Sequence, residues 1–229
     1  MTASWGTRIG IVGLGLMGGS LARALRALPD PPFVRALSDD PEDLQKGLEA
    51  GAIQEARDVG EGFFRDLDLV VYCTPLGATL DLLSNHGKDL EPETLVTDVV
   101  SLKAPVLEAA QAAGLRSSFV GSHPMCGGEG SGFDASRSGL FFGAKIWVVP
   151  GDAPGTEVEE VRGLWTSLGG DVELTGAAEH DRLMAAVSHL PQLTSNALGA
   201  VLGRIGVRPE DLGPGGKDMT RLAGSSPEM

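Results

Sequence analysis

The sequence predicts an α/β protein that begins with a doubly wound, mostly parallel sheet and ends in an incomplete all-helical domain. Strand and helix patterns alternate over residues 1–176, and this alternation is typical of a parallel sheet with helices on both faces. A glycine-rich turn joins the first strand to the first helix. Residues 177–229 show only helical patterns. We therefore expect two domains, 1–176 and 177–229.

Each element follows from its local pattern. Short apolar runs predict buried strands, and apolar residues at helical spacing predict helices that end at Pro or Gly. The expected strands cover residues 8–14, 33–40, 67–75, 94–100, 118–121, 144–150 and 171–174. The expected helices cover residues 17–28, 41–50, 78–90, 104–113 and 156–168. A long helical run follows over 177–205, which we expect Pro191 to kink or split.

Composition excludes several classes of protein. The net charge is −13 and no basic stripe occurs, so nucleic acid is not an expected partner. No apolar run approaches the roughly 20 residues of a membrane span, and the N-terminus lacks the apolar core of a signal peptide. The two cysteines do not form a zinc or disulfide pattern. We expect a cytoplasmic protein without a metal and without a membrane anchor.

The glycine turn carries the first functional signal. Gly13, Gly15 and Gly18 form a G-x-G-x-x-G pattern between a strand and a helix. In a Rossmann turn the first glycine allows the bend, the second admits the pyrophosphate and the third allows helix–strand packing. The turn therefore predicts a Rossmann-type dinucleotide site. We also assign to it four neighbouring residues, Leu16, Met17, Thr74 and Pro75.

The residues at the end of the second expected strand should determine whether the protein prefers NAD or NADP. Ser38 and Asp39 lie about 20 residues beyond the turn, where an acidic side chain binds the adenosine ribose. A carboxylate would repel a 2′-phosphate, whereas a serine could donate to it. We expect NAD, with NADP left open. Asp40, before Pro41, fits a helix N-cap.

His123 is the main candidate for chemistry, because histidine can act as a base near neutral pH. It lies in GSHPMCGGEGSG, after an expected strand and before glycines that predict a loop. Ligands bind at that edge of doubly wound sheets. A purely structural histidine is the alternative.

The chain resembles the prephenate/arogenate dehydrogenase family of tyrosine biosynthesis. Five segments in order carry the resemblance: GLGLMGGSLARAL (13–25), TDVVSLK (97–103), GSHPMCGGEGSG (121–132), EHDRLMAAVSHLPQ (179–192) and KDMTRLAGSSPEM (217–229). The resemblance implies hydride transfer from C4 of a cyclohexadienol to a nicotinamide, loss of the ring carboxylate as CO₂ and aromatisation. It implies no metal.

The resemblance also implies roles for individual residues. His123 would hydrogen-bond the substrate's 4-hydroxyl and take its proton, and Ser101 would orient both; the residues alone favour Ser101 as a helix N-cap. His189 would line the substrate pocket, unless it only satisfies backbone groups that Pro191 frees. Arg221 would bind a substrate carboxylate, and its alternative is a surface arginine.

Two other histidines receive no role in chemistry. We expect His180, with Asp181, to cap and position a helix, and His86 to be solvated.

The chain also departs from the family pattern. Gln192 stands where many prephenate-specific members have a second histidine, and Gly128 offers no carboxylate for the amino group of arogenate, although Glu129 is adjacent. We choose prephenate over arogenate as the substrate. Family members usually continue beyond Met229, so the chain resembles a truncated member, and we expect a homodimer if the helical domain is complete.

Two other readings remain open. The chain could be a non-catalytic nucleotide-binding module, because missing helices would expose the apolar face of 177–205. It could also be another small-acid dehydrogenase or an imine reductase that shares only the glycine turn. The GSHPM and SHLPQ segments argue against the last reading.

Overall fold

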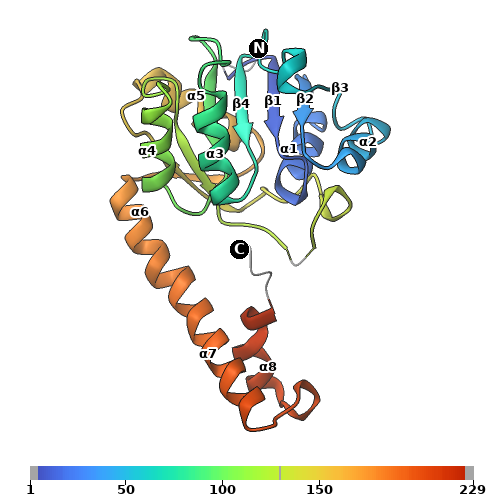
Figure 1. Cartoon of the computed structure of the whole chain (residues 1–229), viewed down its shortest axis with the longest axis vertical. Coiled ribbons are helices and arrows are strands. Elements are labelled where there is room, and N and C mark those ends of the chain that lie inside the picture. The colour runs from blue at the N-terminus through green and yellow to red at the C-terminus, as the bar shows by residue number, and fades with distance from the viewer. Residues whose placement is uncertain (1–4, 129, 225–229) are drawn as a thin grey trace. The chain divides into compact units, whose positions relative to one another are not determined.

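A computed structural model describes residues 5–128 and 130–224 (Figure 1). The chain forms two compact units, the first ending at His180 and the second beginning at Asp181.

A five-stranded parallel sheet forms the centre of the first unit. Its spatial order is β3-β2-β1-β4-β5. The strands are β1 (Arg8–Val12), β2 (Phe33–Leu37), β3 (Glu55–Ala56), β4 (Leu69–Tyr72) and β5 (Leu95–Asp98). The chain therefore builds outwards from β1 in one direction and then from β4 in the other. In such sheets ligands bind where the order reverses, at the carboxyl ends of the two central strands.

A second, three-stranded sheet extends this arrangement. Its order is β6-β7-β8, from β6 (Gly121–Pro124), β7 (Lys145–Val149) and β8 (Asp171–Leu174). A parallel bridge between Val96 and Phe119 links the chain just before β6 to β5. The chain thus enters β6 in the direction of β5, whereas β7 runs antiparallel to β6. The predicted α/β class, with a mostly parallel sheet followed by helices, is confirmed.

Several details of the strand prediction were wrong. The short strand β3 was not predicted, because Glu55 and Ala56 are too few to form a pattern. The second strand ends at Leu37 and not at residue 40. The strand expected at 118–121 runs instead from Gly121 to Pro124, because these residues pair with β7. His123 therefore lies within a strand and not in the loop.

Helices cover both faces of the main sheet. They are α1 (Leu16–Arg26), α2 (Pro41–Glu49), α3 (Leu76–His86), α4 (Ala104–Ala112) and α5 (Gly155–Ser167). Alternate strand residues separate the two cores: Ile9 and Ile11 pack with α1 and α5, whereas Val70 and Tyr72 pack with α3 and α4. Because these strands are buried on both faces, their sequences are continuously apolar.

The second unit continues the helix α6 (Ala177–Met184), which begins in the first unit. A π-helical segment, Ala185–His189, joins it to α7 (Leu190–Arg204). Pro191 lacks an N–H and its ring crowds the carbonyl four residues earlier, so a wider turn at this point relieves the clash. The helical run is thus interrupted just before Pro191.

The helix α8 (Pro214–Thr220) and a 3₁₀ turn (Arg221–Gly224) follow in the second unit and pack back against α7 (Figure 1). Among the described residues, no helix is both long and apolar enough to cross a membrane.

Candidate active site

The glycine turn has the geometry that its sequence predicts. Gly13 adopts φ +89°, and a Cβ there would lie 2.7 Å from Cγ2 of Thr74. A Cβ on Gly18 would overlap the carbonyl oxygen of Gly13. Gly15 differs, because the nearest atom to a Cβ there is the backbone N of Gly132, 4.0 Å away. Only at Gly15 does the turn leave room for another molecule to approach the backbone.

The beginning of α1 suits a negatively charged group. No acidic residue lies in its first turn, and no side chain caps it at Gly15. The N–H groups of Leu16 and Met17 belong to this first turn, where helices have no internal acceptors and the helix dipole is positive. A dinucleotide pyrophosphate therefore fits this turn. Thr74 follows β4 beside Gly13, and Pro75 stands at the N-cap of α3; their contact with a cofactor stays a prediction.

The carboxyl end of β2 lies against the same turn. The backbone N–H of Gly13 donates to the carbonyl of Leu37 at 2.7 Å. Ser38 is half-buried and Asp39 is exposed. The side chain of Asp40 accepts the N–H of Glu42 at 2.9 Å and caps α2, as expected. Asp39 is thus the carboxylate that remains beside the turn.

His123 forms a buried pair with a second histidine. Its Nδ1 lies 2.9 Å from Nε2 of His180, and the two rings meet edge to face with centroids 5.1 Å apart. Both imidazoles are buried, His180 fully. Trp147 is the residue opposite His123 on β7, and its ring also meets His180 edge to face. The imidazole of His123 is therefore held in place by its neighbours.

A buried ion pair fixes the backbone on which His123 stands. Lys103 and Asp98 are both fully buried and form an ion pair. The carboxylate of Asp98 also accepts the N–H of Ser122 at 3.0 Å, and Lys103 donates to the Ser122 carbonyl at 2.6 Å. The Ser122 hydroxyl accepts a bond from Trp165 Nε1 at 2.9 Å. These bonds hold Ser122, the residue before His123, beside the carboxyl end of β5.

The loop after β6 passes over the glycine turn. A Cβ on Gly128 would lie 3.9 Å from Leu16, and Gly132 is the nearest neighbour of Gly15. The loop is anchored further on, where Asp43 of α2 accepts the N–H of Phe133 at 2.8 Å. The chain that leaves His123 therefore leads directly to the predicted cofactor site. Glu129, also considered from the sequence, lies outside the described residues.

Ser101 does not cap a helix. The helix α4 begins at Ala104 with Lys103 at its N-cap, so the expectation of an N-cap at Ser101 was wrong. The side chain of Ser101 is exposed, three residues before the start of α4. Its orienting role toward His123 remains a prediction.

The remaining predicted site residues belong to the second unit. His189 ends the π-helical segment and is half-buried. Gln192 donates to the Asn196 side chain at 3.0 Å and to the carbonyl of Leu222 at 2.6 Å. Arg221 is exposed and begins the last 3₁₀ turn. Gln192 thus ties α7 to the segment that carries Arg221, and the substrate contacts of all three stay predictions.

Neither cysteine is suited to act as a nucleophile. Burial is the main reason that the pKa of Cys73 is raised far above its usual range, and the nearby carboxylate of Asp98 raises it further. Burial raises the pKa of Cys126 to about 11, although Arg137 opposes the shift. A thiol must lose its proton to attack. Within 5–128 and 130–224, no cluster of His, Cys, Asp or Glu could hold a metal ion.

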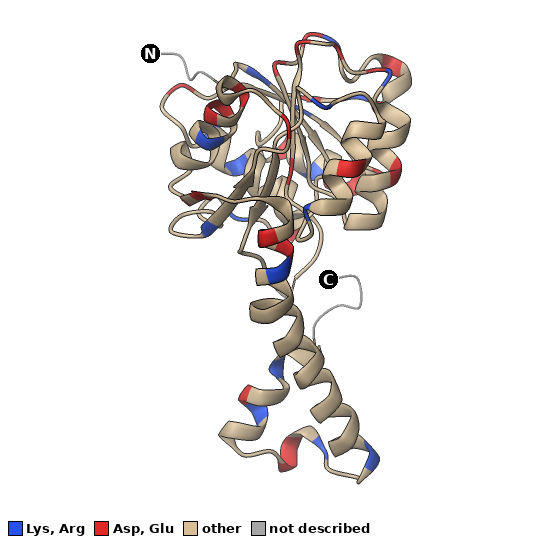
Figure 2. Ribbon diagram, turned by 90° about the vertical axis from the view of Figure 1, so that its left-hand side faces the viewer, with Lys and Arg blue, Asp and Glu red and all other residues tan. Residues whose placement is uncertain are grey.

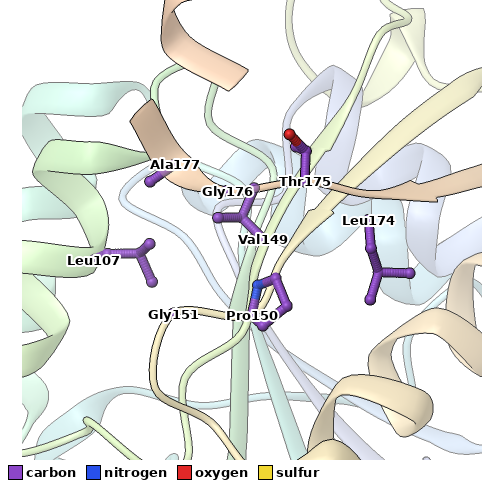
Figure 3. Close-up of a pocket in the computed structure, with 8 residues that line it drawn as sticks. All are labelled: Leu107, Val149, Pro150, Gly151, Leu174, Thr175, Gly176 and Ala177. Carbon is purple, nitrogen blue, oxygen red and sulfur yellow. The ribbon is translucent and has the colours of Figure 1, made fainter. Parts of the chain in front are cut away.

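An open pocket of about 430 Å³ lies beside the first turn of α4 and the start of α6 (Figure 3). The residues that line it are Leu107, Val149, Pro150, Gly151, Leu174, Thr175, Gly176 and Ala177. None of these side chains carries a charge, so the pocket offers no ion-pair partner for a carboxylate.

Sequence reasoning missed two parts of the site. His180 was expected to cap and position a helix, but its side chain contacts His123. Its spacing from Met184, which is also fully buried, puts both residues on one face of the helix, but this spacing does not identify His123 as the partner. Asp98 and Lys103 were quoted only within a motif. Two opposite charges beside an apolar strand are the signal for a buried ion pair.

His86 was expected to be solvated, and this was wrong. The side chain is buried, and its Nδ1 lies 3.2 Å from the hydroxyl of Tyr72.

Two protein-family models match the chain, one after the other. Residues 21–174 match the family described as prephenate dehydrogenase, nucleotide-binding domain, and residues 176–229 match prephenate dehydrogenase, dimerization domain. The chain belongs to the prephenate dehydrogenase family. The resemblance of the five segments is thereby confirmed.

Curated members of the prephenate dehydrogenase family align over nearly the whole chain. It is 32% identical to prephenate dehydrogenase of Bacillus subtilis, over 96% of this chain and 61% of that protein. It is 30% identical to cyclohexadienyl dehydrogenase of Zymomonas mobilis, over 96% of this chain and 78% of that protein. The chain thus spans less than two thirds of the Bacillus protein.

Solved structures of the family share the fold. The complex of Aquifex aeolicus prephenate dehydrogenase with hydroxyphenyl propionate and NAD⁺ superposes with a TM-score of 0.88 and 31% identity, covering 97% of this chain and 79% of that one. Synechocystis arogenate dehydrogenase superposes with a TM-score of 0.81 and 30% identity, covering 96% of this chain and 80% of that one.

Proposed function

We propose that this chain catalyses the NAD-dependent oxidative decarboxylation of prephenate to 4-hydroxyphenylpyruvate, a step of tyrosine biosynthesis. The observation that carries the proposal is the buried imidazole of His123, which is held at the carboxyl end of β6 by His180 and by the clamped Ser122. The loop from His123 leads to the one glycine of the turn, Gly15, that leaves room for a cofactor. The family match and the NAD⁺ complex of the Aquifex protein support the same activity.

The roles of the residues follow from the chemistry. Bound NAD would supply the hydride acceptor. His123 takes the proton of the 4-hydroxyl as hydride leaves the same carbon, and the ring carboxylate departs as CO₂. The electron pair of the broken C–C bond makes the ring aromatic, and His123 returns its proton to the phenolate oxygen. Hydride and CO₂ account for all that the substrate loses.

The cofactor is proposed to be NAD rather than NADP. The exposed carboxylate of Asp39 lies at the end of β2, where it would accept hydrogen bonds from the adenosine ribose and repel a 2′-phosphate. Ser38 could donate to such a phosphate, so an assay with both cofactors decides the choice.

Arogenate is the second candidate substrate. The Zymomonas relative is named a cyclohexadienyl dehydrogenase and the Synechocystis structure an arogenate dehydrogenase. Gly128, beside Leu16, carries no carboxylate to hold the amino group of arogenate, and this favours prephenate.

We also propose a homodimer in the cytoplasm. The match of residues 176–229 to a dimerization domain supports a second copy of this chain as partner. Both cysteines are free, which suits a reducing compartment.

Replacing His123 tests the mechanism. We expect His123→Asn to lower kcat with prephenate by at least about 10²-fold, the lower range for the loss of a general base. Because His123 lies outside the glycine turn, NAD affinity by calorimetry should stay within about twofold of the wild type.

Cys126→Ser is the matched control, since it changes a neighbouring residue of the same segment that has no assigned chemistry. Near-normal kcat for His123→Asn, with the control unchanged, would reject His123 as the base.

A further inference from the structure

The contact between Nδ1 of His123 and Nε2 of His180 needs one nitrogen that carries a proton and one that does not. A neutral imidazole has one N–H donor and one bare nitrogen acceptor. Only two arrangements of the 2.9 Å bond are therefore available: Nδ1 of His123 donates to Nε2 of His180, or the reverse. Each arrangement fixes which nitrogen of His123 can accept a proton.

Both rings are held firmly. His180 is fully buried, and its backbone N–H donates to the carbonyl of Gly176 at 2.9 Å. His123 follows Ser122, whose N–H and carbonyl are bound by the buried Asp98 and Lys103. Because both rings are buried and bonded to each other, the tautomer of one determines the tautomer of the other.

We infer that His180 is a positioning residue, whose Nε2 accepts the Nδ1 proton of His123 and so presents Nε2 of His123 as the proton acceptor. This inference rests on the proposed function, because the reaction needs His123 to take a proton. The opposite arrangement would put the proton of His123 on Nε2, where it could donate but not accept.

The same bond helps once the proton has moved. When Nε2 of His123 takes the hydroxyl proton, the ring becomes an imidazolium and its Nδ1–H bond to His180 becomes charge-assisted. Such bonds are shorter and about twice as strong as neutral ones. His180 thus stabilises the protonated state without touching the substrate. In the serine-protease triad, holding an imidazole in the required tautomer is worth about 10⁴ in kcat.

Nitrogen NMR of the histidines tests the inference without any assay of activity. The chain has four histidines, so ¹⁵N-labelled histidine gives a spectrum in which each ring can be assigned by substitution. We expect His123 in the wild type, with or without NAD, to be the Nδ1–H tautomer. A wild-type His123 with its proton on Nε2 would overturn the inference, whatever the enzyme does.

Two substitutions of His180 distinguish a role in positioning His123 from a purely structural role. His180→Gln places an amide oxygen near the former Nε2 and can still accept, whereas His180→Phe fills the space without an acceptor. We expect His180→Phe to move the His123 proton to Nε2 and to lower kcat at least tenfold with little change in KM. His180→Gln should restore the Nδ1–H tautomer and most of kcat.

NAD affinity and the unfolding midpoint serve as controls for folding. Equal kcat losses in both variants, with an unchanged His123 tautomer, would show a merely structural role and overturn the inference. If the tautomers behave as expected but wild-type protein turns over neither prephenate nor arogenate, the proposed function fails and the positioning of His123 stands.

Discussion

Gly15 and Gly18 lie three residues apart in one turn, yet a side chain would meet different obstacles at each. A Cβ on Gly15 would contact little of the chain itself, whereas one on Gly18 would overlap the carbonyl of Gly13. Gly15 leaves space for a ligand, whereas Gly18 allows the helix to pack closely against the turn. Only the local spacing was needed to predict this, because a strand–turn–helix is specified by neighbouring residues.

We therefore expect Gly15→Val and Gly18→Val to fail in different ways. Gly15→Val should leave the unfolding midpoint nearly unchanged and weaken NAD binding at least tenfold, because its side chain enters the space for the pyrophosphate. Gly18→Val should lower the free energy of unfolding by more than about 2 kcal/mol, as overpacking does.

Calorimetric titration with NAD and urea denaturation measure the two effects. Gly77, in α3 with open space at its Cβ, provides a matched Gly→Val control. Tight NAD binding by Gly15→Val would contradict the assignment of this turn to the cofactor.

His180 shows what the residue pattern alone could not reveal. Its partner His123 is 57 positions away along the chain, and no local spacing predicts a contact over that distance. The sequence could nominate His123, because a histidine before a glycine-rich loop is unusual, but the group that holds it depends on tertiary packing.

At the scale of elements, the buried ion pair joins β5, the start of α4 and β6. Asp98 ends β5, Lys103 directly precedes α4, and both bind Ser122 of β6. Removing one partner of a buried pair leaves the other charge without compensation, which costs about 3–5 kcal/mol. Each partner is therefore needed to keep the other charge compensated at the junction between the two sheets.

We expect Lys103→Met to lower the free energy of unfolding by about 3–5 kcal/mol, as measured by urea denaturation. The double variant Asp98→Asn/Lys103→Met should recover part of that loss, because no unpaired charge then remains. Lys145→Met is the control, since Lys145 makes its ion pairs at the surface, where a pair contributes at most about 1 kcal/mol. Equal losses for Lys103→Met and Lys145→Met would refute this need for compensation in the buried pair.

The strands and helices of the first unit were predictable where apolar residues recur with a clear period. Strand β6 was misplaced because GSHP has neither an apolar run nor an alternation, and its strand conformation comes from pairing with β7. Likewise β3 exists only because it pairs with β2. Pairing between distant segments is the information that a local pattern lacks.

At the scale of the whole molecule, the second unit carries an apolar surface that its own helices do not cover. No charged residue lies between Arg182 and Arg204, and this stretch of α6 and α7 is uniformly tan in Figure 2. Leu193, Val201 and Ile205 are each more than half exposed. Apolar surface of this kind is typical of a protein interface, and the matched family segment is a dimerization domain.

We expect light scattering to give twice the 23.7 kDa mass of the chain. Val201→Asp with Ile205→Asp should yield monomers, because two carboxylates would have to be buried in the interface. Asp substitutions at Leu48 and Phe142, exposed apolar residues of the first unit, are the control and should leave the dimer intact. A wild-type monomer at micromolar concentration would contradict the proposed homodimer.

The central claim is tested most directly by an assay of nicotinamide reduction with prephenate and arogenate, each with NAD and with NADP. We expect reduction with prephenate and NAD, with 4-hydroxyphenylpyruvate and CO₂ formed in equal amounts. Much slower turnover of arogenate is expected, since Gly128 offers no carboxylate to its amino group. Protein that is folded and binds NAD, yet reduces neither cofactor with either acid, would contradict the claim and favour a non-catalytic nucleotide-binding module.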